Sequence, residues 1–369
     1  MKLRQHLLAI GLSALIGSLQ AAPLDTDKLE VTTVGEGLGI PWGMTFIDDH
    51  HILVTNKAGA LNRVDIRNAE KTRISGIPDD INTSGQGGFL DVATPPDFAD
   101  SGWIYFTYSK DVDGQGATTL ARAKLNGESL SDWQDLLVTD SRTGKGQHYG
   151  SRVVFDNHGH VFFGIGDRGE QDQAQDLSRH NGKILRLNLD GSVPDDNPFV
   201  GQDNVHPEIW SYGHRNPQGM FYNRQTDTLW EIEHGPRGGD EINLIKAGKN
   251  YGWPEASHGK EYWAPVAVGE KQVKGMDNAV KVYIPSIAPS GLLQYQGNAF
   301  PALQGDLLTG AMVLQHLNHI EMDGLKPVDE HRYFEDQQQR VRNVIEGPGG
   351  LLYFATDNGQ IKQLKPAGN

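Results

Sequence analysis

Five short stretches of the chain carry polar side chains that can do chemistry, set among turn glycines. They are GQGGFLD (85–91), GQHYGSR (146–152), SYGHRNPQG (211–219), EHGPRGGDEINLI (233–245) and QRVRN (339–343). His148 offers an imidazole, which can exchange a proton near pH 7. Arg340 and Arg342 are two residues apart, so in an extended strand both guanidinium groups point to the same side. There they could bind carboxylates through parallel hydrogen bonds.

Each of these features also has a purely structural interpretation. A single histidine at a strand edge is more often structural or merely exposed, and two arginines on one strand usually form a solvated face. Gly235 and Pro236 alone indicate a turn, and Glu241 alone indicates a surface charge. The functional interpretation therefore depends on whether the fold brings the five stretches together.

Short β-rich runs bounded by turn residues recur along the chain and predict its fold. Glycine is abundant, with 45 residues, and helical apolar periodicity is hard to find after residue 22. A unit of three strands repeats with starts near residues 42, 89, 152, 217, 288 and 341. This spacing predicts one all-β domain over residues 23–369, a six-bladed β-propeller, whose channel loops would present the five stretches.

The N-terminal segment and the composition limit the setting in which the protein works. Residues 1–22 place two basic residues before a short apolar run and end in two alanines, the layout of a secretory signal peptide. We therefore expect an exported protein, periplasmic or secreted, without stable membrane insertion. The net charge of −14 argues against nucleic-acid partners, because phosphate binding needs clustered positive charge. The chain has no cysteine, so packing or bound ions must stabilise it.

Two local motifs that could indicate other chemistry fail on their context. GIGDRG (164–169) fits the dinucleotide-binding pattern, but the residues after it lack the apolar helix that such a site needs. DVDGQG (111–116) begins like a calcium loop, but its twelfth position is Arg122, where a bidentate glutamate is required. The sequence also lacks H-E-x-x-H and G-x-S-x-G, which disfavours a zinc protease or a serine hydrolase.

The five stretches resemble, in order, those of the soluble pyrroloquinoline quinone (PQQ)-dependent sugar dehydrogenases, the glucose/sorbosone dehydrogenase family. Further landmarks of the resemblance are PWGM (41–44), NYGWP (250–254), IAPSG (287–291) and LLYFATD (351–357). The resemblance covers essentially the whole mature chain and implies a six-bladed propeller, in agreement with the repeats. It also implies oxidation of an aldose sugar at C1 to a lactone, with two electrons passed to a separate electron acceptor.

The resemblance implies a catalytic pair and a substrate contact. His148 matches the family's catalytic histidine, which would act as general base on the anomeric hydroxyl while hydride passes to C5 of the quinone. Asp167 matches a carboxylate that orients this histidine and stabilises its charged form. Gln86 matches a glutamine that binds the sugar.

The resemblance also implies the cofactor contacts. PQQ carries three carboxylates, so its site in an acidic protein should concentrate arginines. Arg215, Arg340 and Arg342 match the family positions, and Arg215 would also face the negative charge that develops on the quinone oxygen. Asn216 and Tyr262 match further cofactor contacts.

Calcium is the second cofactor that the resemblance implies. One ion would bind the backbone carbonyl oxygens of Gly235 and Pro236 and polarise the quinone carbonyl that accepts hydride. A second, structural ion matches Glu241 and Tyr251. In a chain without cysteine, such an ion would act as a crosslink.

The sequence departs from the family at position 313. Many members carry a lysine there that pairs with the cofactor, whereas this chain has Val313 and no lysine between Gly305 and Gly324. The missing cation should weaken cofactor binding by about 1–3 kcal/mol if the contact is buried. Gln315, His316 or another group would have to compensate.

Two other functions fit the same fold. A lactone-hydrolysing propeller would need a divalent metal ringed by carboxylates, whereas the channel loops supply arginines and carbonyl groups. A carbohydrate-binding propeller without catalysis would follow if the cofactor site has decayed at Val313. Dye reduction by protein supplied with PQQ, calcium and glucose separates these alternatives.

Overall fold

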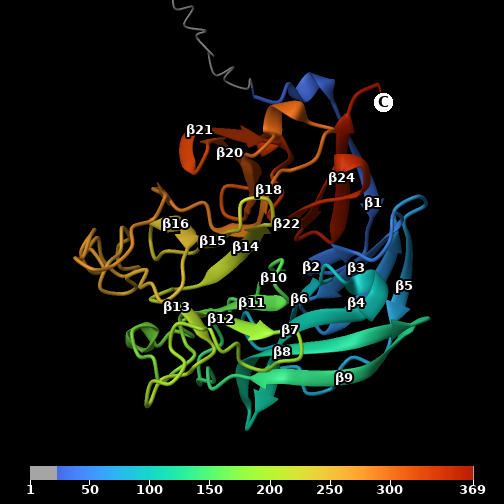
Figure 1. Ribbon diagram of the computed structural model, residues 1–369. Coiled ribbons are helices and arrows are strands. Elements are labelled where there is room, and N and C mark those ends of the chain that lie inside the picture. Colours follow the sequence, from blue (N-terminus) through green and yellow to red (C-terminus); the bar gives the residue numbers. More distant parts are fainter. Residues whose placement is uncertain (1–22, 369) are drawn as a thin grey trace, which may run out of the picture.

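The structure is a computed structural model that describes residues 23–368. The expected signal peptide, residues 1–22, lies outside the described residues. In the described part, 24 strands form six antiparallel sheets of four strands each, arranged as blades around a central channel (Figure 1). The predicted six-bladed β-propeller is confirmed. No helix among these residues is long and apolar enough to cross a membrane.

Five blades are each formed by four consecutive strands, which follow one another from the channel outward. These are β2 (Pro41–Phe46), β3 (His51–Asn56), β4 (Ala60–Asp65) and β5 (Glu70–Ile74); β6 (Phe89–Ala93), β7 (Trp103–Val112), β8 (Gln115–Asn126) and β9 (Ser129–Val138); β10 (Val153–Phe155), β11 (His160–Ile165), β12 (Lys183–Asn188) and β13 (Ile209–Tyr212); β14 (Pro217–Asn223), β15 (Thr228–Glu233), β16 (Asp240–Ile245) and β17 (Lys281–Tyr283); and β18 (Pro289–Gln294), β19 (Leu307–Ala311), β20 (His316–Asp323) and β21 (Lys326–Tyr333). Each innermost strand begins within one residue of a predicted repeat start.

The sixth blade joins the two ends of the chain. Its inner strands are β22 (Val341–Glu346), β23 (Leu352–Thr356) and β24 (Gln360–Pro366), and its outer strand is β1 (Leu29–Gly35). Figure 1 shows β1, in blue, beside β24, in red. The antiparallel register pairs Leu29 with Pro366 and Thr33 with Lys362, which closes the ring.

The remaining regular elements are single turns of helix in the connections. They are η1 (Thr26–Lys28), α1 (Phe98–Ser101), η2 (Gln171–Ala174), η3 (Pro301–Leu303), η4 (Glu335–Gln337) and η5 (Pro348–Gly350). The GIGDRG motif spans the end of β11 and the turn after it, and only the short η2 follows.

The hydrophobic core lies between neighbouring blades. Leu53 and Leu61 of the first blade, for example, pack in one cluster with Phe89 and Phe106 of the second. The innermost strands approach one another closely near the axis, and Gly43 permits this, since a Cβ atom there would lie 2.5 Å from Asp91 Oδ1. Packing of blade on blade therefore fixes the innermost strands relative to one another.

Antiparallel pairing within each blade positions the loops of the five stretches. The residues before an innermost strand lie beside the turn after the second strand, as the pairs Pro41–Asn56 and Val341–Thr356 show. Five of the six innermost strands also shift register near this end, and such bulges re-aim side chains at a rim. One end of the channel thus collects two segments from every blade.

Candidate active site

A cavity of about 330 Å³ lies at this end of the channel. Four residues singled out from the sequence, Gln86, Asn216, Arg340 and Arg342, line it together with Lys57. The other lining residues are Ile40, Trp42, Leu90, Tyr149, Gly150, Gln218, His234, Ala288, Met312 and Asp357. Side chains from all six blades therefore share one cavity.

His148 lies beside this cavity in a loop with an unusual backbone. Its φ is 56°, and Gly150 and Ser151 follow with φ of 63° and 94°, so two non-glycine residues occupy a region that such residues rarely adopt. The His148 N–H donates to Gln86 Oε1 at 2.8 Å, which ties the loop to the cavity lining. The imidazole is 12% exposed. The loop therefore presents a nearly buried imidazole at the channel.

Asp167 holds the His148 ring from behind. The His148 Nδ1 lies 2.7 Å from Asp167 Oδ1, which also accepts from the Gly169 N–H at 2.7 Å, while Trp253 Nε1 donates to Oδ2 at 2.8 Å. Burial opposes ionisation, but the hydrogen bonds from His148 and from the Gly169 N–H help to offset it, so the pKa of Asp167 lies below its usual value. An ionised carboxylate only accepts, so Nδ1 carries a proton and Nε2 is left to take one from a substrate.

Two residues that support this pair had no role in the sequence-based hypothesis. Trp253 belongs to the NYGWP landmark, and its indole fixes the Asp167 carboxylate. Arg168 is fully buried, and its guanidinium donates hydrogen bonds to four backbone carbonyl oxygens. These belong to Gly116, Ser141, Lys145 and Gln147. This guanidinium therefore clamps the loop that carries His148.

Arg340 and Arg342 meet at a carboxylate that sequence reasoning missed. Arg342 donates Nε and Nη2 to the two oxygens of Asp357, both at 2.8 Å, and Arg340 donates Nε at 2.8 Å. Burial opposes ionisation of Asp357, but the two arginines hold its pKa below its usual value. Two guanidinium groups with one carboxylate leave this wall of the cavity with a net positive charge.

Lys57 supplies a third cation to the cavity. It lies in the turn after β3, and burial together with the charge of Arg342 lowers its pKa.

Val313, the residue at which the sequence departs from the family, is 58% exposed and is not packed in the core. His316 is fully buried and its Nδ1 faces the Leu314 carbonyl oxygen at 3.1 Å, so the described cavity lining does not include it.

Arg215 and three of the predicted calcium ligands line a small adjoining cavity. Gly235, Glu241 and Tyr251 share this lining with Arg215 and Glu233. Arg215 Nη1 donates to the carbonyl oxygen of Gly235 at 2.8 Å, and Glu233 accepts from the Arg215 N–H. The small cavity is therefore bounded by carbonyl and carboxylate oxygens, the donor type that calcium prefers.

The remaining predicted ligand and cofactor contacts lie as follows. The Pro236 carbonyl oxygen accepts from Ser286 Oγ at 3.3 Å. Asn216 Oδ1 accepts from the Gly150 N–H at 3.2 Å, which connects it to the His148 loop. Tyr262 is 68% exposed and lies outside the described lining of both cavities, so the structure does not bring it to the other predicted cofactor contacts.

Glu233 and Glu241 line the small cavity, Glu231 lies behind them, and Arg215 is the one cation in the described lining. Burial raises the pKa of Glu241 well above its usual value, and the charge of Glu233 adds to the effect. Burial and Glu233 raise the pKa of Glu231 in the same way, and Glu231 Oε1 has no hydrogen-bond partner among the described residues. Such a group needs a proton or a cation. The residues present therefore fit a bound calcium ion.

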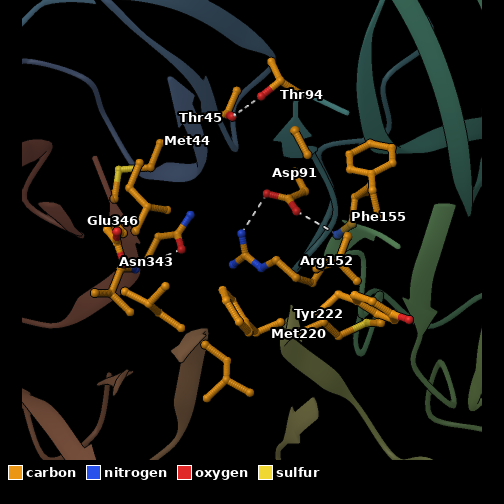
Figure 2. Close-up of a pocket in the computed structure, with 18 of the residues that line it drawn as sticks. Met44, Thr45, Asp91, Thr94, Arg152, Phe155, Met220, Tyr222, Asn343 and Glu346 are labelled. Atoms are coloured by element: carbon orange, nitrogen blue, oxygen red, sulfur yellow. Dashed lines mark hydrogen bonds and ion pairs between the residues drawn. The ribbon is translucent and has the colours of Figure 1, made fainter. Parts of the chain in front are cut away.

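A larger cavity, about 440 Å³, occupies the opposite part of the channel. Figure 2 shows Asp91 and Arg152 pointing toward each other among its lining residues. Arg152 Nη1 lies 2.7 Å from Asp91 Oδ1, and the guanidinium stacks 4.5 Å from the ring centroid of Trp42, which lines the smaller channel cavity. Arg152 thus lies between the two parts of the channel.

Comparison with known proteins places this geometry in a family. The sequence profile described as glucose/sorbosone dehydrogenase matches residues 38–364. The aldose sugar dehydrogenase YliI of Escherichia coli (strain K12) is 37% identical over 372 aligned residues, which cover 98% of this chain and 99% of YliI. The match therefore extends over nearly the full length of both proteins.

Two solved structures share both the fold and more than a quarter of the aligned residues with this chain. The apo-form of the soluble aldose sugar dehydrogenase from Escherichia coli matches with a TM-score of 0.87 at 38% identity, covering 92% of this chain and 99% of that one. The PQQ-bound aldose sugar dehydrogenase from Streptomyces coelicolor matches with a TM-score of 0.76 at 27% identity, covering 92% and 98%. The chain therefore belongs to the glucose/sorbosone dehydrogenase family and is an oxidoreductase of the sugar dehydrogenase class.

Proposed function

We propose that the protein oxidises aldose sugars at C1 to lactones, with PQQ as hydride acceptor and calcium as its metal, and passes the electrons to a separate acceptor. The observation that carries this proposal is the convergence of the His148–Asp167 pair with a cavity that holds Lys57, Arg340 and Arg342. We further propose that residues 1–22 direct export to the periplasm or the medium.

The cavity residues fit a planar polyanion. The cavity lining carries three positive side chains, those of Lys57, Arg340 and Arg342, and one carboxylate, that of Asp357. The lining therefore has two positive charges in excess. Arg340 uses only Nε on Asp357 among the described residues, so its terminal nitrogens remain for a ligand carboxylate. Lys57 provides the cation that the family carries at the position of Val313. When bound, calcium-capped PQQ would supply the electrophilic carbonyl that accepts a hydride.

The residues of the chain handle the proton. A sugar hydroxyl held near Gln86 would lie beside the His148 loop, because Gln86 and His148 are joined by a hydrogen bond. His148 Nε2 would take the hydroxyl proton as the C1 hydride leaves, and the nearby Asp167 carboxylate would stabilise the imidazolium. Arg215 would stabilise the negative charge that forms on the acceptor.

The lactonase alternative lacks its metal ring. Among the described residues that line the smaller channel cavity, Asp357 is the one carboxylate, and two arginines engage it. The decisive experiment is reconstitution of chelator-treated protein with PQQ and calcium, followed by dye reduction with glucose and other aldoses. Absence of sugar-dependent reduction in correctly folded protein would favour a binding propeller.

Replacing Arg342 with glutamine should raise the PQQ concentration needed for half-maximal activity. Loss of a charge-assisted hydrogen bond costs about 1.5–3 kcal/mol, which corresponds to about 10- to 100-fold weaker binding. The measurement is a reconstitution curve at saturating calcium. Arg332→Gln, an exposed arginine on β21 that pairs with Glu330, is the matched control. Superimposable curves for Arg342→Gln and wild type would remove Arg342 from the cofactor site.

Calcium should stabilise the chelator-treated protein, and more strongly at higher pH. Burial raises the pKa of Asp240 to about 6 and that of Glu241 well above its usual value. Because the folded-state pKa values of these two carboxyl groups exceed the unfolded ones, the stability that they contribute without calcium is fully present below about pH 4 and is lost as pH rises through about 6. A cation replaces the missing protons and offsets this loss.

The measurement for this calcium effect is the melting temperature with and without calcium. At free calcium about 100 times Kd, stabilisation should reach about 2.7 kcal/mol, with a larger gain near pH 8 than near pH 5. Glu241→Gln should reduce the gain, whereas Glu255→Gln, at an exposed site, should not. A gain independent of both pH and Glu241 would contradict the assignment.

A further inference from the structure

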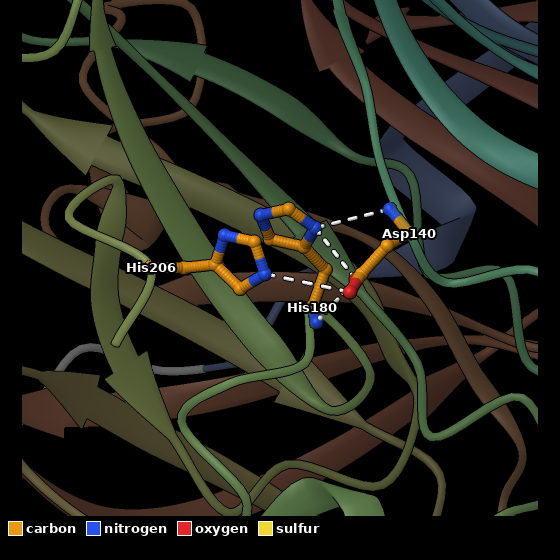
Figure 3. A group of neighbouring side chains, drawn as sticks. All are labelled: Asp140, His180 and His206. Carbon is orange, nitrogen blue, oxygen red and sulfur yellow. Dashed lines mark hydrogen bonds and ion pairs between the residues drawn. The ribbon is translucent and has the colours of Figure 1, made fainter. Parts of the chain in front are cut away.

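Two histidines and two carboxylates cluster away from the channel, between the second and third blades. Asp140 follows β9, His180 precedes β12, and His206 and Glu208 precede β13. Figure 3 shows the two imidazole rings face to face with the Asp140 carboxylate at their edge. The ring centroids are 3.8 Å apart. None of these residues touches the proposed catalytic pair.

Glu208 selects the tautomer of His180 and lies beside the His206 ring. Its Oε1 lies 2.6 Å from His180 Nε2 and 3.4 Å from His206 Nδ1. The surrounding hydrogen bonds hold the pKa of Glu208 below its usual value despite burial, so it is an ionised acceptor. A proton on His180 Nε2 leaves its Nδ1 as a free lone pair, whereas His206 Nε2 hydrogen-bonds to Asp140 Oδ2 at 3.4 Å and would have to give up its proton, or pass it to Nδ1 beside Glu208, to bind a metal. The N–H of Asp140 also points to His180 Nδ1, at 3.1 Å, which agrees with an unprotonated nitrogen.

The other nitrogen of each ring faces the Asp140 carboxylate. His180 Nδ1 lies 2.8 Å from Asp140 Oδ1, and His206 Nε2 lies 3.4 Å from Asp140 Oδ2. The ligand atoms of Asp140, His180 and His206 all lie within 4.8 Å of one another. Lone pairs that converge in this way repel one another unless a cation or an additional proton lies between them.

We propose that Asp140, His180 Nδ1 and His206 Nε2 bind a divalent transition metal, with zinc as the expected ion. Two imidazoles and a carboxylate suit zinc, and solvent would complete a tetrahedral shell. Glu208 would act through the histidines, as carboxylates behind zinc-bound imidazoles commonly do. His180 is buried, while Asp140 and His206 are partly exposed, so an ion can reach the site from solvent.

The charges around the cluster permit a cation. Arg179 is the neighbouring positive group, with Nη1 3.4 Å from Asp140 Oδ2 and Nη2 bonded to the Asp140 carbonyl oxygen. Even so, the carboxylates of Asp140 and Glu208 contact both imidazole rings, so two negative groups face the ring nitrogens where Arg179 contributes one positive group. Metal–ligand distances of about 2.0–2.2 Å in a tetrahedral shell require the ligand atoms to lie roughly 3.3 Å apart. Asp140 now lies 2.8 Å from His180 Nδ1 and 3.4 Å from His206 Nε2, so the side chains need to separate only slightly.

The site would join segments that support the catalytic loop. Ser141, next to Asp140, accepts from Arg168 at 3.0 Å, and Arg168 clamps the loop of His148. Asn181, next to His180, donates to the Asp167 carbonyl oxygen at 3.3 Å. In a chain without cysteine, a metal here would crosslink two blades behind the proposed active site.

The test uses full-length chelator-treated protein without PQQ, in excess calcium so that calcium sites are filled. Titration with zinc, followed by calorimetry, should show about one tight equivalent, and cobalt should give the visible absorption of a tetrahedral site. His206→Gln should abolish both signals, and Glu208→Ala should weaken binding by about 10- to 100-fold. His50→Gln, an exposed histidine outside the cluster, should leave them unchanged.

Far-UV circular dichroism of each variant checks that the fold is retained. His206 is partly exposed, so its replacement should not unfold the protein. If folded wild type binds no zinc under these conditions, the proposal is wrong and the cluster holds a proton instead. Equal zinc binding by wild type and His206→Gln would likewise overturn the assigned site.

Discussion

The His148→Ala protein, loaded with PQQ and calcium, should turn over sugar about 10²- to 10⁴-fold more slowly than wild type, the range lost when a general base is removed. The reason lies in the geometry: Asp167 accepts a hydrogen bond from His148 Nδ1–H, so Nε2 is the basic atom, and both side chains are nearly buried. The measurement is kcat for dye reduction at saturating sugar and cofactor.

Controls separate this loss from misfolding. His158→Ala, an exposed histidine paired with Asp227 at the surface, should keep wild-type kcat. The His148 variant should bind PQQ normally, because its backbone N–H still donates to Gln86. Wild-type turnover by a folded His148→Ala protein would rule out His148 as the base.

Removing Asp91 should destabilise the fold by about 3–5 kcal/mol, since it leaves a buried charge without its partner. Arg152 is almost fully buried, and Asp91 accepts from its guanidinium at 2.7 Å and from the Val153 N–H at 2.8 Å. Arg152 also donates to the Gln218 carbonyl oxygen and stacks on Trp42. The pair therefore links four blades at the axis, and urea unfolding of Asp91→Ala measures its contribution.

A double variant and a surface variant sharpen this prediction. Asp91→Ala with Arg152→Met should regain part of the stability, because no buried charge then lacks a partner. Glu30→Ala removes a surface pair with Lys365 and should change the unfolding midpoint little, since solvent screens that pair. An unfolding midpoint of Asp91→Ala equal to that of wild type would show that the axial pair contributes no net stability.

The sequence predicted the fold well because every blade repeats the same short strands and turns. The starts of the innermost strands could be placed to within one residue from that period alone. The strand that completes the sixth blade was not predicted. β1 reads LEVTTVG and is half exposed, so, like the outermost strands β5 and β21, it lacks the apolar run that marks the inner strands.

The candidate site could be predicted only in part. His148, Gln86, Arg340 and Arg342 were found because the motifs around them match a family. Lys57 and Asp357 were missed, although each follows the second strand of its blade, as Asp167 does. Aligning the repeats with one another would have placed all three at the channel.

Other contacts depend on distances that no local pattern contains. Trp253 reaches Asp167 across 86 residues of sequence, and Arg152 reaches Asp91 across 61. The buried carboxylates Glu231 and Glu233 alternate along β15 like ordinary strand residues, and only packing shows that Glu231 Oε1 lacks a hydrogen-bond partner among the described residues.

Pairing of β1 with β24 has a consequence for how the molecule is made. The ribosome synthesises β1 first and its partner last, so the circle cannot be completed on a nascent chain. The early blades must wait with one side uncovered until residue 366 has emerged. A chain that ends before β24 would lack the pairing of β1 with β24 that closes the ring. The sides of its first and last blades that pack together in the complete chain would then be exposed to water.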